Sequence, residues 1–126
     1  MPLYGALQTP IAMYPGDEVN VFNAEVLTPT ANSEAVNLAP VAFGGPVGQY
    51  QILVRLHFAS APTSFTFTVQ GAMDDVTTEY LQIGTIATST ATDSQVAITC
   101  STPFVRAQLS AQSGGGAVTV GVFRVA

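Results

Sequence analysis

Residues 50–58 read YQILVRLHF, and after a short turn residues 64–70 read SFTFTVQ. Apolar and polar residues alternate through both stretches, which is the period of a β-strand with one buried face. The predicted inward-facing residues are Ile52, Val54, Leu56, Phe58, Phe65, Phe67 and Val69. The two stretches together favour a sheet that is half buried and half exposed to water.

Similar short stretches occur along most of the remaining chain. Further strands are predicted at residues 19–27, 35–38, 79–87, 95–100, 104–110 and 117–125. No stretch combines a helical period with helix caps. We therefore expect an all-β fold of seven or eight strands, an antiparallel β-sandwich with jelly-roll or Greek-key-like connections.

The strand predicted at residues 19–27 changes phase along its length. Val19, Val21 and Val26 are all expected to face inward. Val26 is five residues after Val21, an odd spacing that a regular alternation would place on the opposite face. An extra residue in one strand of a pair would restore the pairing. The phase change predicts a β-bulge near residues 23–24.

Two other segments carry predictions about side-chain direction and chain connection. Residues 79–87 are expected to form a strand with Leu81, Ile83 and Thr85 facing inward. Residues 112–116 read QSGGG. Because glycine adopts positive φ without steric cost, this segment predicts a hairpin turn between the last two strands.

Residues 1–18 differ from the rest of the chain. Prolines at positions 2, 10 and 15 interrupt them, and no strand or helix period fits, so we expect an extended arm before a single domain at residues 19–126. The arm is rich in apolar residues, which favours packing on the domain itself or on a neighbouring subunit. The expected anchors at such an interface are Leu3, Tyr4, Leu7, Ile11 and Tyr14.

The chain carries very little charge. Charged residues make up 9% of 126 positions, whereas about a quarter is usual in soluble domains, and no lysine is present. A net charge of −5 with three arginines argues against nucleic-acid binding and against anionic membrane surfaces. No apolar run is long enough to span a bilayer, and residues 1–5 show no signal-peptide pattern. Such a composition favours a protein that hides much of its surface in an assembly.

Residues suited to catalysis are few. Cys100 is the single cysteine, so no internal disulfide forms, and its place in an apolar strand favours a buried thiol and synthesis in a reducing cytoplasm. His57 is the single histidine and shares the polar face of its strand with Arg55; we expect both at the surface or at an interface. Asp74 and Asp75 lack the ligand spacing of a calcium loop. We expect no enzyme activity, no catalytic residues, no metal and no cofactor.

Part of the chain resembles a known pattern. The segments concerned are FTFTVQ at 65–70, GAMDD at 71–75, YLQIGT at 80–85, FVRAQL at 104–109 and GGGAVTV at 114–120. They are similar to small β-sandwich structural proteins of tailed bacteriophages, in which a strand–hairpin–strand unit precedes an F-V-R-A strand, a glycine turn and a V-T-V strand. The resemblance covers about half of the chain.

This resemblance implies a virion component without chemistry of its own. The specific expectation is a capsid decoration, or cement, protein that binds the major capsid protein on the head surface, is made in the host cytoplasm and forms a homo-oligomer, with a trimer favoured. Two alternatives stay open: a carbohydrate- or ligand-binding β-sandwich of a phage tail or fibre, which would expose aromatic residues in a groove, and another tail or neck subunit. An enzyme is the least favoured class.

Overall fold

A computed structural model describes residues 11–25, 31–38, 49–86 and 91–125. Ten strands and one 3-10 turn lie in the described part of the chain. In order they are β1 (Ile11–Ala12), β2 (Glu18–Glu25), β3 (Ala31–Asn32), β4 (Val36–Asn37), β5 (Tyr50–Phe58), β6 (Pro62–Ala72), η1 (Thr77–Glu79), β7 (Leu81–Ile86), β8 (Asp93–Cys100), β9 (Phe104–Gly114) and β10 (Val118–Arg124). Within the same residues, no helix has the length and hydropathy needed to cross a membrane.

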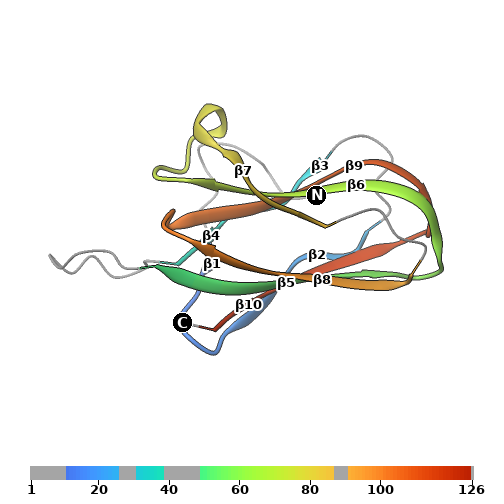
Figure 1. The fold of residues 1–126 in the computed structure, drawn as a ribbon, viewed down its shortest axis with the longest axis horizontal. Coiled ribbons are helices and arrows are strands. Elements are labelled where there is room, and N and C mark those ends of the chain that lie inside the picture. The colour runs from blue at the N-terminus through green and yellow to red at the C-terminus, as the bar shows by residue number, and fades with distance from the viewer. Residues whose placement is uncertain (1–10, 26–30, 39–48, 87–90, 126) are drawn as a thin grey trace, which may run out of the picture.

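The strands form two sheets that pack face to face (Figure 1). The six-stranded sheet has the order β1-β4-β9-β6-β7, with β3 also paired to β9, and the four-stranded sheet has the order β2-β10-β5-β8. The chain is thus an all-β sandwich, as its sequence predicts. One pair departs from the expected antiparallel arrangement, since the short strands β1 and β4 run parallel.

Strands β5 and β6 supply much of the core. The alternation in their sequences is reproduced in their burial, with every second side chain of β5 turned inward. The rings of Phe58 and Phe65 lie 5.1 Å apart between centroids, where the chain leaves one sheet for the other. The largest fully buried side chains are Phe22, Phe58, Phe65, Phe67, Met13, Leu38, Ile52, Leu56, Leu109, Val36, Val54 and Val69.

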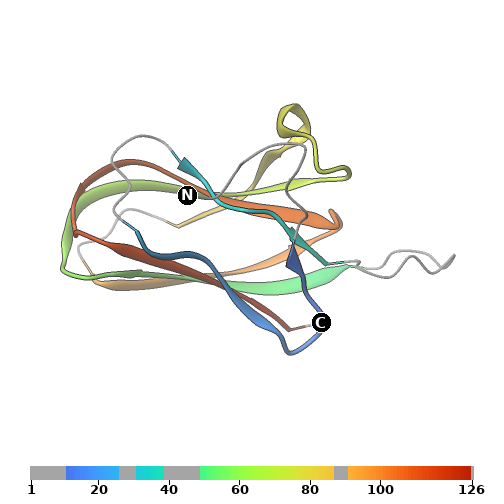
Figure 2. The same cartoon turned by 180° about the vertical axis from the view of Figure 1, so that it is seen from behind.

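The glycine segment after β9 is a corner between the sheets. β9 belongs to the six-stranded sheet and β10 to the four-stranded sheet, so the expected hairpin turn at residues 112–116 is wrong. Gly114, Gly115 and Gly116 have φ of 71°, 84° and 68°, which explains the need for glycine. A Cβ at Gly115 would also lie 2.8 Å from Cδ1 of Phe58. The β5–β6 and β9–β10 connections turn this corner side by side (Figures 1 and 2).

The bulge predicted in β2 is confirmed. Val118 and Val120 of β10 pair with Glu25 and Phe22, so the two intervening residues of β2 face only one residue of β10. A second register shift follows at Val21. As a result, Val21 and Phe22 are both buried although they are neighbours in the chain. Val26 lies outside the described residues.

Strand β7 corrects the directions expected for its side chains. Val69 and Gln70 of β6 pair with Gly84 and Gln82, which leaves Ile83 as an extra residue in β7. The bulge reverses the alternation, and β7 is an edge strand with a neighbour on one side only. Ile83 packs against the core as expected, but Leu81 is 71% exposed and Thr85 is exposed.

The described part of the predicted arm packs on the sandwich. The amides of Ile11 and Met13 donate hydrogen bonds to the carbonyls of Ala35 and Asn37, both at 2.9 Å, and the Met13 side chain is fully buried. Nη1 of Arg124 donates to the carbonyl of Met13 at 2.6 Å. Residues 11–13 are therefore fastened to the domain from which the arm was expected to extend.

The five expected arm anchors divide into two groups. Ile11 is partly buried against this chain's own core, and Tyr14 is 51% exposed. Leu3, Tyr4 and Leu7 lie outside the described residues. Contact between these residues and a second molecule stays a prediction.

Candidate functional site

The outer face of the four-stranded sheet contains a polar hollow. Asn20, Gly121, Arg55 and Gln95 pair across the four strands and form one row on this face. Because Gly121 has no side chain, the row is open at its second position. The hollow has a volume of about 530 Å³, and its lining also includes Glu18, Leu56, His57, Asp93, Ser94 and Thr119.

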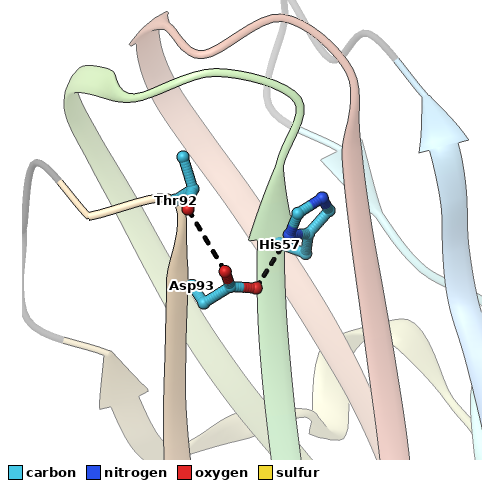
Figure 3. Close-up of polar contacts among 3 residues, drawn as sticks. All are labelled: His57, Thr92 and Asp93. Atoms are coloured by element: carbon cyan, nitrogen blue, oxygen red, sulfur yellow. Dashed lines mark hydrogen bonds and ion pairs between the residues drawn. The ribbon is translucent and has the colours of Figure 1, made fainter.

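An ion pair borders this hollow. Nδ1 of His57 on β5 lies 2.7 Å from Oδ1 of Asp93 on β8 (Figure 3). The Thr92 hydroxyl donates a longer hydrogen bond of 3.2 Å to the other carboxylate oxygen. The hydrogen bond from His57 is the main reason that the pKa of Asp93 lies below that of a free aspartate. The two side chains are 58% and 74% exposed, so the pair lies at the surface in contact with water.

A row with three apolar residues, called the apolar row, lies next to the polar row on the same face, and Glu18 of β2 occupies its fourth position. Phe123 of β10 pairs with Leu53 of β5, which in turn pairs with Ala97 of β8. Phe123 and Leu53 are half-buried, and Ala97 is exposed. Residues two apart in a strand lie about 7 Å from each other, so the apolar row lies that distance along the strands from the row that contains Gly121.

Of the site residues predicted from sequence, the structure brings Arg55 and His57 together at the hollow. The partners that complete the lining, such as Asn20, Asp93 and Gln95, were not predicted from the sequence. These residues come from two strands, β2 and β8, and their proximity to Arg55 and His57 follows from the sheet order β2-β10-β5-β8. The sequence alone showed only the alternation of polar and apolar residues along each strand.

The pairing of β5 with β8 also separates Cys100 from His57. Cys100 pairs with Tyr50 at one end of β5, whereas His57 lies near the other end, seven residues away or about 23 Å along the strand. Cys100 is buried and faces the core, and burial raises the pKa of its thiol. The two residues therefore do not form a nucleophile–base pair. Among the described residues, no group of three or more His, Cys, Asp or Glu is placed to hold a metal ion.

The outer face of the six-stranded sheet is almost without charge. Arg106 on β9 is the one charged residue in the six strands of this sheet as the structure describes them. Its guanidinium carbon lies 4.1 Å from the centre of the Tyr80 ring, and its Nε donates a 2.7 Å hydrogen bond to Oε1 of Gln70. The Arg106 charge is thus partly covered by neighbouring side chains.

Several other polar groups at this sheet form hydrogen bonds with neighbouring side chains. The Tyr80 hydroxyl donates to Oδ1 of Asp75 at 2.6 Å, and burial together with this carboxylate raises the pKa of Tyr80. The Gln108 amide donates to Oδ1 of Asn32 at 2.9 Å. On the strands themselves, the uncharged side chains of Asn32, Thr68 and Gln108 are thus linked by cross-strand hydrogen bonds.

None of the tyrosines that the structure describes lines the polar hollow. Tyr50 and Tyr80 are buried, Tyr14 is exposed, and Tyr4 lies outside the described residues.

Comparison with known proteins gives no help in assigning the site, since no protein-family model matches this chain and a search of curated proteins finds no match.

Proposed function

We propose that this chain is a non-enzymatic structural protein of a virus particle, a capsid decoration subunit that binds the head lattice and other copies of itself. The observation that carries the proposal is the outer face of the six-stranded sheet, where one partly covered arginine is the only charge on the six strands within the described residues. Free protein surfaces normally carry about 25–35% charged residues, whereas interface cores are depleted in Lys, Glu and Asp.

The face suits contact with another protein because its desolvation leaves few charges unpaired. Burying an unpaired charge costs several kcal/mol, and satisfied polar side chains avoid much of that cost. Gln108, Asn32 and Thr68 already bond to one another, so their side chains are ordered before contact. Binding that occurs only on the assembled lattice stabilises that lattice by mass action, and many copies act together.

The arm has a defined place in this proposal. β1 lies at an edge of the six-stranded sheet and is fastened by Met13 and Arg124, so the chain before Ile11 continues from the edge of the proposed contact face. The anchors Leu3, Tyr4 and Leu7 would then reach a neighbouring subunit. Because Met13 is part of the core, a deletion that tests the arm has to stop at residue 10.

A charge placed on the proposed face tests the proposal. Thr66 on β6 and Thr99 on β8 are both exposed threonines, one on each sheet. We expect the wild-type chain to sediment with purified virus particles and to form a trimer in light scattering. Thr66→Lys should weaken both associations at least tenfold, while Thr99→Lys should leave them unchanged.

Two results would count against the proposal. One is the absence of the chain from purified particles of the virus that encodes it. The other is binding by Thr66→Lys that equals wild type while the deletion of residues 2–10 also has no effect. Circular dichroism of each variant shows whether the sandwich is intact, so that loss of binding is not confused with unfolding.

A further inference from the structure

We propose that the polar hollow on the four-stranded sheet is a binding site for a neutral saccharide, with Arg55, Asn20 and Gln95 bonding to its hydroxyls. This inference does not depend on the proposed decoration function, because it concerns the opposite sheet. The volume of about 530 Å³ falls within the range of small-molecule sites, about 300–1,000 Å³.

The hollow is placed on a rigid part of the molecule. Its floor is Gly121 on β10, which has paired strands on both sides. The lining residues sit on β2, β5, β8 and β10 rather than on long loops. Residues on paired strands keep their backbone positions, which lowers the entropy lost on binding.

The polar groups match a ligand that carries many hydroxyls. Asn20 and Gln95 each offer an amide donor and a carbonyl acceptor, and the Arg55 fork offers several donors in one plane. The carboxylates of Glu18 and Asp93 accept hydrogen bonds. A sugar hydroxyl both donates and accepts, so adjacent hydroxyls satisfy such a mixed set better than a ligand with acceptors alone.

The charges favour a neutral ligand. The carboxylates of Glu18 and Asp93 stand against the guanidinium of Arg55, so the lining has no excess of positive charge. The chain as a whole carries a net charge of −5. A phosphate or a polyanion would be repelled by the two carboxylates.

The apolar row lies beside the hollow, outside its lining. Phe123 and Leu53 lie one step along the same face from Gly121 and Arg55. Sugar rings have C–H groups on one face, and an aromatic ring beside polar groups suits such a ligand. The hollow and its rim thus offer separate surfaces for the hydroxyls and for the C–H face.

The His57–Asp93 pair has a positioning role at the rim. Asp93 engages Nδ1 of the imidazole, which leaves Nε2 directed away from the carboxylate (Figure 3). Nε2 is then the ring nitrogen that a bound hydroxyl can reach.

The test is an NMR titration of isotope-labelled protein with a panel of oligosaccharides three to six units long. One arm of the panel holds fragments of bacterial surface polysaccharides, and the other holds oligosaccharides from eukaryotic glycoproteins, so the source is separated from the chemistry. Each arm includes an acidic member. We expect neutral members to bind, with shifts centred on Arg55, Gln95 and Gly121, and acidic members to bind at least tenfold more weakly.

Two variants and one control sharpen the result. Arg55→Ala removes the main donor, and Gly121→Val fills the hollow, where a new Cβ would lie 3.1 Å from the movable Oδ1 of Asn20. Each should weaken binding at least tenfold, while Thr66→Ala on the other sheet should not change it. The proposal is overturned if no panel member binds at millimolar concentration, if the shifts lie on other residues, or if both variants bind like wild type.

Discussion

Replacement of Met13 by alanine tests whether the N-terminal segment is part of the folded core. The side chain is fully buried between the sheets, so its removal loses burial energy and leaves a cavity. Such substitutions cost about 2–5 kcal/mol, and we expect about 3 kcal/mol here. For a chain of this length, each kcal/mol lowers Tm by about 4 °C, so the expected loss is about 12 °C.

Urea unfolding followed by circular dichroism measures the free energy directly. The matched control is Tyr14→Ala at the next position, where the side chain is 51% exposed and the expected cost is within about 0.5 kcal/mol. If Met13→Ala and Tyr14→Ala were equally stable, the segment would not be docked in solution. The reasoning that joins residues 11–13 to the sandwich would then be refuted.

Three further predictions concern the corner, the thiol and the ion pair. Gly115→Ala should cost at least 1 kcal/mol more than Gly116→Ala in urea unfolding, because both have positive φ but only the first Cβ would meet the core within 3 Å. Equal costs would contradict the packing at the corner. Cys100 should resist a thiol reagent at pH 8 in the native state and react in urea, since burial raises its pKa; fast native labelling would contradict this. The pKa of Asp93, measured by NMR, should lie below that of a free aspartate and rise in His57→Ala. Because the folded-state pKa is lowered, the pair stabilises the fold above the ordinary aspartate pKa, and this is lost as pH falls through the lowered value. An unchanged pKa in the variant would show that the pair does not form in solution.

Strand-level features of this chain are encoded locally. The alternation in residues 50–58 and 64–70 predicted β5 and the centre of β6, because burial of one face imposes a period of two on each strand. The phase of Val26 also indicated the bulge in β2, although the burial of Phe22 did not follow from it. Local prediction failed at Leu81, where a bulge at Ile83 reversed the alternation.

The candidate site could be predicted only in part. Arg55 and His57 were visible as polar residues on an otherwise apolar strand. Their partners Asp93 and Gln95 are 36 to 40 residues away in the chain and are brought alongside by the register of β5 and β8. Residues on one strand fix which side chains share a face, whereas cross-strand partners depend on a register that only the folded sheet sets.

The sequence by itself determined the class of fold, the strands with the clearest alternation and the scarcity of charge. The tertiary structure decided where the few charges lie, placing one on the six-stranded sheet and a mixed group around Gly121 on the other. It also turned the QSGGG segment into a corner between sheets instead of a hairpin. The physical reason is the same in each case: hydrophobic periodicity acts within a strand, but the choice of neighbouring strand depends on packing across the whole sandwich.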